Sequence, residues 1–351
     1  MTHDANSRPT LAAVARLAGV SPSTASLAFS GSGPVSGATR KRVLAAAAEL
    51  DYAGPDPRAQ SLRRGRSGIV GVIVEERVSE AFRDPIMLAM LDGIADGIGP
   101  LGAGLLLLTD TGDGAVSIES APVDAVVLFG CSPRLGHAVA VLTQRGIPIV
   151  VIEGDAGAGV LQILLDNREA TRASAEHLFA LGHRTVSMVT LPIDERRTRG
   201  RVTIEREQGI PAGTAADRLA GARDVFPELH AVSAAASSIE EGLAAGRMLL
   251  HDPARRPSAI IAQSDLLAAG VIRAAEELGL AVPADLSVVG FDGVRVDGLA
   301  PYDLTTLVQP AVAKGQAAGE AVLRMLAGET PASVRFTSVF HRGNTTAAPR
   351  A

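Results

Sequence analysis

The feature of this sequence that most constrains its fold is an alternation of short β-rich runs with helical stretches, which begins at Gly68. The runs are GIVGVIV, GLLLLTD, DAVVLFG, IPIVVIEG, TVSMVT, AIIAQS and LSVVGFDG, and segments such as REATRASAEHLFALGH and DLLAAGVIRAAEELGL lie between them. This alternation predicts parallel sheets that are covered by helices on both faces. There are enough strands for two such sheets, so we expect an α/β body of two lobes with a cleft between them.

Polar turns follow several of the predicted strands. FGCS, IEGD, AQSD and GFDG fall at the carboxyl ends of strands, where folds of this class bind their ligands. We therefore expect a small-molecule site in the cleft. The longest irregular stretch, LPIDERRTRGRVTIEREQGIPAGTAADR, is charged and is expected to be a surface loop that leads into a helix.

The amino-terminal segment has a different texture and reads as three short helices. Thr10 is placed to cap a first helix, LAAVARLA, and Gly19 suits the left-handed residue that follows it. Ser21 is a predicted cap for a second helix, with Pro22 in its first turn, where a missing N–H costs nothing. A third helix follows Ser36 and has an apolar stripe of Val43, Leu44, Ala47 and Leu50. Two short helices joined by a tight glycine turn and braced by a third predict a small all-α helix-turn-helix head.

The second helix, PSTASLAFS, is unusually small and uncharged. A helix in the major groove of DNA needs small polar residues near its start, because its backbone must approach closely and its hydroxyls must reach phosphate oxygens. The alternative is an ordinary capped surface helix, since Ser-Pro starts are common. Charge favours DNA: residues 1–66 contain nine basic and four acidic residues, a net +5, which leaves −10 for the rest of a chain whose total is −5. A basic head on an acidic body is typical of a chain that meets a polyanion at one end.

Composition narrows the class of protein further. With 351 residues, 47% of them apolar and 20% charged, the chain is expected to be globular with two or three domains. No apolar run reaches the roughly 18 residues of a membrane helix, and MTHDANSRPT leads into no signal core, so a cytoplasmic, nucleoid-associated protein is expected. The single cysteine, Cys131, permits no internal disulfide and is expected to be buried filler rather than a nucleophile. The seven histidines are scattered, so neither a metal site nor a cofactor is expected.

A series of motifs runs through nearly the whole chain, from residue 9 to residue 346. They are TLAAVARLAGVSPSTASLAFSGSGPVSGATRKRVLAAAAELDY, PRAQSLRRGRSGIVGVIV, DNREATRASAEHLFALGH, RLAG, VPADLSVVGFDG, DLTTLVQP and RGNT. In this order they resemble the lactose-repressor (LacI/GalR) family of bacterial transcriptional regulators. The resemblance implies a homodimer whose two heads read a palindromic operator in double-stranded DNA. It also implies a body similar to periplasmic sugar-binding proteins, which binds a small effector such as a sugar, and it implies a repressor rather than an enzyme.

The resemblance divides the chain into three parts. Residues 9–56 correspond to the helix-turn-helix domain, residues 57–67 to a hinge helix or linker, and residues 68–346 to a two-lobed domain for effector binding and dimerisation. The chain ends just after RGNT without an added heptad repeat, which favours a dimer over a tetramer.

Family positions in the head imply the DNA contacts. Pro22, Ser23 and Leu27 are expected at base edges, and the expected contacts to phosphates are Thr24, Ser26 and Ser30; Leu11 and Ser21 complete the expected DNA-binding set in the head. Leu27 stands where the family usually has Arg, and Ser30 stands where it usually has Asn. Because leucine can only pack on apolar surface such as a thymine methyl, we expect weak guanine discrimination at that operator position.

The linker resembles the family's hinge helix, which implies that Leu62 is a wedge in the minor groove and that Ala59 lets two hinge helices touch. Arg58 and the neighbouring arginines are expected near phosphates, so binding should weaken with salt. The alternative is a flexible linker in which Leu62 packs on the body.

In the body the resemblance implies effector contacts from five polar residues: Glu153, Arg218, Ser264, Asp292 and Gln309. The alternatives are that Arg218 only pairs with Asp217 or Asp224, that Asp292 caps a turn, and that Glu153 is solvated. Near Ser237, where several sugar-responsive relatives stack an aromatic ring, the chain reads AAASSIEE. Phe82 and Phe129 are the aromatic residues expected to line the cleft.

The resemblance implies that the lobes close or rotate around effector and so change the distance between paired hinges; whether effector releases or promotes DNA binding stays open. Two rival functions remain. One is a periplasmic-type solute receptor without a DNA role, which the DNA-type head disfavours. The other is a nucleotide-dependent enzyme, but GDAGAG lacks the G-x-G-x-x-G spacing and no G-x-x-x-x-G-K-[ST] motif occurs.

Overall fold

The chain divides into two compact units, residues 1–67 and residues 68–351. The computed structural model describes residues 9–31, 33–54, 65–74, 78–109, 117–130 and 134–350. The predictions for Arg58, Ala59, Leu62 and Cys131 lie outside the described residues. Within the described residues, no helix is long and apolar enough to cross a membrane.

The first unit holds the three predicted helices, α1 (Leu11–Leu17), α2 (Pro22–Ser30) and α3 (Gly37–Glu49). Each begins at the predicted cap: the hydroxyl oxygens of Thr10, Ser21 and Ser36 accept a backbone N–H three residues on, at 3.1–3.2 Å. Gly19 lies in the turn that follows α1 and has a φ of 63°, the left-handed conformation that glycine adopts without strain. Local capping chemistry therefore decides where these short helices start.

A small core holds the three helices together. It is built from small and branched side chains: Val14, Ala15, Ala18, Ala25, Ala28, Val43, Ala46 and Ala47. Leu44, which the sequence predicts on the inner stripe of α3, is 44% exposed, and Ala46 takes the buried place. The prediction was wrong for Leu44 because the face of α3 that packs on the other two helices consists of Val43, Ala46, Ala47 and Leu50, and Leu44 lies at its edge.

The first lobe of the second unit is a six-stranded parallel sheet with the order β12-β5-β4-β3-β1-β2. Its strands are β1 (Ile69–Val74), β2 (Gly104–Thr109), β3 (Ala125–Phe129), β4 (Ile149–Ile152), β5 (Leu161–Leu165) and β12 (Val334–Phe336). α6 (Pro85–Ile98) and α13 (Ala311–Leu326) pack on one face and α7 (Leu135–Gln144) packs on the other. The short elements α5 (Val78–Ala81) and η1 (Gly99–Leu101) flank α6. Alternate residues of β1, β2, β3 and β4 belong to the cores on the two faces of the sheet, as expected for a sheet covered on both faces.

The second lobe has a five-stranded sheet with the order β10-β9-β6-β8-β7. Its strands are β6 (Val186–Thr190), β7 (Gly200–Arg201), β8 (His230–Ser233), β9 (Ala259–Ala262) and β10 (Ser287–Val289). α8 (Asn167–Ala180) and α10 (Thr214–Arg223) cover one face, and α11 (Ile239–Leu250) and α12 (Asp265–Glu277) cover the other. The two predicted α/β lobes are confirmed, with one addition: the stretch expected as a loop contains β7, which is antiparallel to β8, and α9 (Ile204–Gln208).

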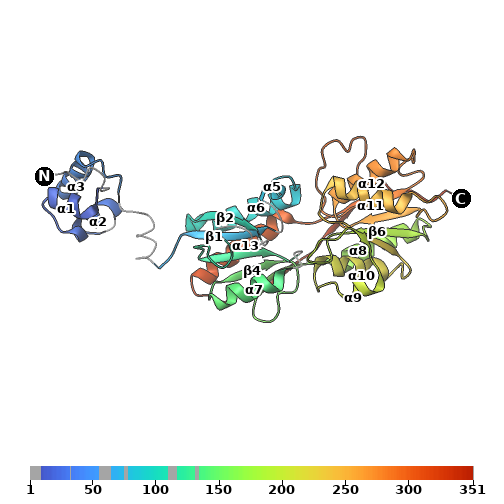
Figure 1. Cartoon of the computed structure of the whole chain (residues 1–351), viewed down its shortest axis with the longest axis horizontal. Coiled ribbons are helices and arrows are strands. Elements are labelled where there is room, and N and C mark those ends of the chain that lie inside the picture. Colours follow the sequence, from blue (N-terminus) through green and yellow to red (C-terminus); the bar gives the residue numbers. More distant parts are fainter. Residues whose placement is uncertain are drawn as a thin grey trace. The chain divides into compact units, whose positions relative to one another are not determined.

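Three crossings of the chain join the two lobes, and Figure 1 shows them between the lobes. They lie between β5 and α8, between β11 (Thr306–Val308) and α13, and between β12 and β13 (Val339–His341). Asp166 in the first crossing accepts the backbone N–H and the hydroxyl of Ser338 in the third, both at 2.8 Å. The first and third crossings are therefore bonded to each other.

Candidate functional site

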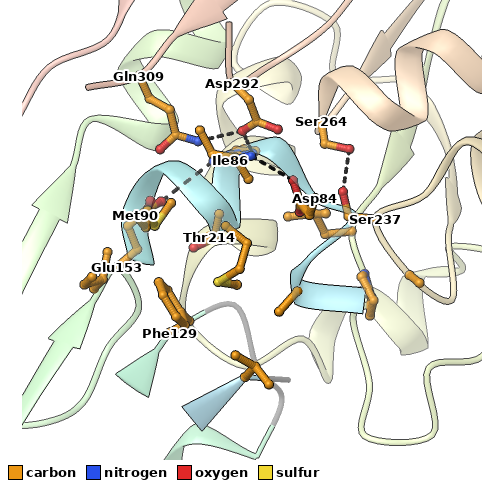
Figure 2. A pocket seen from close by; sticks show the side chains of 18 of the residues that line it. Asp84, Ile86, Met90, Phe129, Glu153, Thr214, Ser237, Ser264, Asp292 and Gln309 are labelled. Atoms are coloured by element: carbon orange, nitrogen blue, oxygen red, sulfur yellow. Dashed lines mark hydrogen bonds and ion pairs between the residues drawn. The ribbon is translucent and has the colours of Figure 1, made fainter. Parts of the chain in front are cut away.

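A cavity of about 140 Å³ lies between the two lobes, beside the crossings. The first lobe contributes side chains from the ends of its strands and from the start of α6, and the second contributes side chains that follow β6, β8, β9 and β10. Figure 2 shows side chains from both lobes turned toward this space. Most of the lining is apolar, with Ile86, Met87, Met90, Ile152 and Leu191 among it, and a few polar groups converge on it. A mostly apolar hollow with a few convergent polar groups is the usual form of a small-molecule site.

The structure brings six of the seven expected effector residues to this pocket: Phe129, Glu153, Arg218, Ser264, Asp292 and Gln309. Phe82 is placed elsewhere: its side chain is 57% exposed and its neighbour Ala81 lines the pocket instead. In the segment before α6, the small side chain of Ala81 faces the pocket and the ring of Phe82 faces solvent. Phe129 is thus the one aromatic side chain among the described lining residues.

Arg218 is held in place by several contacts at once. Its Nε donates to the side-chain oxygen of Asn167 at 2.8 Å, and a terminal nitrogen donates to the carbonyl of Gln263 at 2.5 Å. The guanidinium carbon lies 3.5 Å from the centroid of the Phe291 ring. Its ion-pair partners are Glu153 at 3.7 Å and Asp292 at 3.9 Å, not Asp217 or Asp224. Because its geometry is set beforehand, this arginine can present charge to a ligand with little loss of conformational entropy.

Glu153 is a buried carboxylate at the end of β4, only 6% exposed. Burial would raise the pKa of Glu153, but the charges of Lys314 and Arg218 outweigh burial, and hydrogen bonds from Lys314 and Asn167 add to them. Together they lower the pKa of Glu153 to about 2. The side chain is therefore a fixed negative charge in the pocket wall rather than a solvated one.

Asp292 behaves in the opposite way. Burial raises the pKa of Asp292 well above its usual range, and the nearby Asp265 and Asp84 carboxyls add to the rise against the opposing charge of Arg218. Its backbone has a φ of 125°, and Glu153 has a φ of 62°. Of the four described non-glycine residues with positive φ, three line the pocket, the third being Arg197. Such backbone strain, about 1–3 kcal/mol per residue, gathers at functional sites where surrounding structure enforces it.

Hydroxyl groups complete the wall in the second lobe. The Ser237 hydroxyl donates to the Ser264 oxygen at 2.9 Å, and Ser264 also caps α12 by accepting the Leu267 N–H. Thr214 lines the pocket, is 4% exposed, and its hydroxyl has no hydrogen-bond partner in the described part of the protein. A buried hydroxyl without a partner costs free energy, which a ligand group can recover.

Sequence reasoning missed Asn167, Thr214 and Lys314. A signal existed for Lys314, since this lysine interrupts the run AVAKGQAAG, in which small apolar residues face a neighbouring helix. No comparable signal marks Asn167 or Thr214, which are ordinary helix-start residues until the fold places them. In the described residues, no group of three or more His, Cys, Asp or Glu is arranged to hold a metal ion.

In the first unit, the expected DNA-contacting residues gather on the outer side of α2. Pro22, Ser23 and Leu27 are exposed, while Ala25 and Ala28 on the opposite side are buried. The Thr24 and Ser21 hydroxyls bond to each other at 2.9 Å, and the Ser30 hydroxyl donates to the Leu27 carbonyl at 3.3 Å. Leu11 is half-buried and packs against the head core. A short helix with an exposed row of small polar groups and one leucine has the form of a helix that enters a groove.

Comparison with known proteins agrees with this arrangement. Residues 10–54 match the family of bacterial regulatory proteins of the lacI type, and residues 175–346 match a periplasmic binding protein-like domain. The HTH-type transcriptional regulator IpsA of Corynebacterium glutamicum is 32% identical over 96% of this chain and 97% of its own length.

Two solved structures extend the likeness to three dimensions. A LacI-family transcriptional regulator from Corynebacterium glutamicum is 28% identical, with a TM-score of 0.72 over 97% of this chain and 100% of that one. The transcriptional regulator CelR in complex with cellobiose is 25% identical, with a TM-score of 0.65 over 96% of this chain and 100% of that one. The chain belongs to the LacI family and is a DNA-binding transcriptional regulator of the helix-turn-helix type.

Proposed function

We propose that this regulator is a repressor whose affinity for operator DNA is controlled by a small, hydroxyl-rich effector in the pocket between the lobes. One observation carries the effector role: charged and polar side chains are pre-arranged around the pocket, where the Thr214 hydroxyl lacks a hydrogen-bond partner among the described residues. Carboxyl, guanidinium and hydroxyl groups suit a ligand that offers many hydroxyls, such as a sugar. The complex of the related CelR with cellobiose supports the same class of ligand.

The proposal assigns a role to each part of the chain. Residues 9–56 form the DNA-binding domain, residues 57–67 the hinge, and residues 68–346 the effector-binding and dimerisation domain. A homodimer presents two copies of α2 to the two halves of a palindromic operator, in the cytoplasm, where the chromosome lies. The head contacts are Leu11, Ser21, Pro22, Ser23, Thr24, Ser26, Leu27 and Ser30, and the hinge contacts are Arg58, Ala59 and Leu62.

An effector acts by its different affinity for two arrangements of the lobes. The crossings link the lobes and the pocket lies beside them, so a ligand that contacts both lobes shifts their relative orientation. The shift reaches the hinge and changes operator affinity, and operator must change effector affinity by the same factor.

Two measurements on the full-length protein test this function. Selection from random duplexes should return a twofold-symmetric sequence, and a thermal-shift screen of sugars and polyols should raise the melting temperature by mass action. A sugar that raises the melting temperature should also change operator affinity in a fluorescence anisotropy assay. A binding sugar that leaves operator affinity unchanged at every concentration would refute the proposal.

A further inference from the structure

Lys314 lies directly behind the pocket wall and joins its two halves. It is near the start of α13, is completely buried, and is not among the residues that line the pocket. Its ammonium group donates to the carboxylate of Glu153, in the first lobe, and to the side-chain oxygen of Gln309, in the second crossing. A buried lysine is costly unless it is paired and hydrogen-bonded, so these two bonds account for its presence there.

The two partners of Lys314, Glu153 and Gln309, are also linked to each other through side chains of the second lobe. Glu153 accepts from the Asn167 amide at 2.8 Å, and Asn167 in turn accepts from Arg218 at 2.8 Å. Gln309 donates to Asp292 at 2.6 Å, and Arg218 and Asp292 are 3.9 Å apart. These side chains form a closed ring, in the order Lys314, Glu153, Asn167, Arg218, Asp292, Gln309. Two of its links reach into the second lobe: the bond between Glu153 and Asn167 starts in the first lobe, and the bond between Gln309 and Asp292 starts in the second crossing.

The chemistry of lysine fixes which groups of this ring donate hydrogen bonds and which accept them. An ammonium group has three donors and no acceptor, so Gln309 must turn its side-chain oxygen toward Lys314 and its NH₂ toward Asp292. The same charge lies against Glu153, which therefore stays a carboxylate and accepts from Asn167. The pattern of donors and acceptors on the pocket wall thus depends on a residue that the ligand does not touch.

We propose that Lys314 is the positioning residue of the effector pocket: it holds Glu153 ionised and orients the Gln309 amide, and thereby sets which hydrogen bonds the wall offers to a ligand. The inference rests on the proposed function only in taking this pocket as the effector site. The chain has just two lysines, Lys41 and Lys314, among 33 basic residues, so the buried site uses a compact ammonium group where nearly every other cation is a guanidinium.

A double-mutant cycle in the full-length protein tests the charge link. Lys314→Met keeps the length of the side chain and removes the charge, so it leaves the Glu153 carboxylate buried beside Arg218 alone. At pH 7 this variant should unfold at lower denaturant concentration than the wild type, and Glu153→Gln in the same background should recover part of the loss. Lys41→Met is the matched control, because Lys41 is the exposed lysine of α3. Its effect on the unfolding midpoint should be the same whether residue 153 is Glu or Gln.

The pH profile separates this role from ordinary packing. The folded-state pKa of Glu153 is about 2, below its ordinary 4.5, so its stabilising contribution is present above pH 4.5 and is lost as the pH falls toward 2. The charged groups that face it are Lys314 and, in the second lobe, Arg218 and Asp217. Asp292 pairs with the same Arg218, at 3.9 Å. Without Lys314, burial raises the pKa of Glu153, so the deficit of Lys314→Met should be largest near neutral pH and shrink below about pH 4.5. A deficit that is the same at every pH, or no coupling in the cycle, would overturn the proposal.

The orientation of Gln309 has its own spectroscopic readout. In protein labelled with ¹⁵N at glutamine side chains, the Gln309 NH₂ signal, assigned by its loss in Gln309→Leu, should shift in Lys314→Met and stay in place in Lys41→Met. An unmoved signal would overturn the positioning role. If no sugar or polyol raises the melting temperature of the wild type, the proposed effector function fails, while the cycle and this signal still decide the role of Lys314.

Discussion

At the scale of single residues, Leu27 is the side chain of α2 that we propose reads one base of the operator. It is 38% exposed on α2, and its side chain lies against Gly33, where an added Cβ would come within 3.1 Å of it. A leucine offers only apolar contact, whereas arginine can donate two hydrogen bonds to O6 and N7 of guanine. If Leu27 contacts a base edge as proposed, the base preference at that operator position depends on this side chain.

We predict that Leu27→Arg changes the preferred base at that position from A·T to G·C. A bidentate contact is worth about 1–3 kcal/mol of discrimination, so competition between duplexes that differ only at this position should show it. Leu17→Arg is the control: Leu17 is 47% exposed on α1, and an arginine there adds the same charge outside α2. The control should strengthen binding to all duplexes without a change of preference, and equal preferences in the two variants would contradict the prediction.

At the scale of elements, the pair α6 and α13 supports one wall of the pocket. The two helices lie side by side in the first lobe (Figure 1), and glycines allow their backbones to meet. A Cβ on Gly93 would lie 2.1 Å from the Val312 carbonyl oxygen, and one on Gly315 would lie 2.2 Å from the Met90 carbonyl oxygen. Because Met90 lines the pocket and α13 holds Lys314, this close approach positions the wall.

We predict that Gly93→Ala destabilises the body by about 1–3 kcal/mol or more, because the new methyl group must push two helix backbones apart. Gly136→Ala is the matched control: Gly136 is exposed in the first turn of α7, in the same lobe, and an added Cβ there meets nothing within 4 Å. That control should be neutral or slightly stabilising. Urea denaturation measures both, and equal midpoints for the two variants would argue against close packing.

At the scale of the whole molecule, the distribution of charge separates the two tasks. Residues 1–66 have a net charge of +5 and the rest of the chain has −10, so under the proposed function the first segment attracts DNA phosphates and the body does not. Linkage requires that effector and operator change each other's affinity by one factor, but salt acts on the two partners differently. Phosphate contacts release counterions, whereas a neutral sugar in a buried pocket releases none.

We predict that operator binding falls by roughly 10³–10⁵ between 50 mM and 200 mM salt, the range for 6–10 phosphate contacts. Fluorescence anisotropy of a labelled operator over a salt series gives the slope. The shift in melting temperature that a bound sugar causes should stay nearly constant over the same series. A shallow slope for the operator would mean that few phosphates are neutralised and would speak against the assigned contacts.

Much of this protein is determined by its sequence alone, because the signals are local. Thr10, Ser21 and Ser36 cap the head helices with hydroxyls that reach only three residues along the chain. The seven β-rich runs predicted as strands in the body all form strands. The expected polar residues Ser264 and Asp292, which follow β9 and β10, do lie in one pocket, since the strand ends of a parallel sheet meet at one edge. Arg218 lies on α10, and its place in the pocket was expected from the family resemblance.

Only the tertiary structure shows which further side chains complete that site and which expected ones lie outside it. Lys314 meets Glu153 across 161 positions of sequence, and Asn167 meets Arg218 across 51. Phe82 and Leu44 are both exposed, although their apolar side chains led to the prediction that they face the pocket and the head core. Burial and pairing at such separations depend on how helices and sheets pack against one another, and a period of two or 3.6 residues contains no information about that packing.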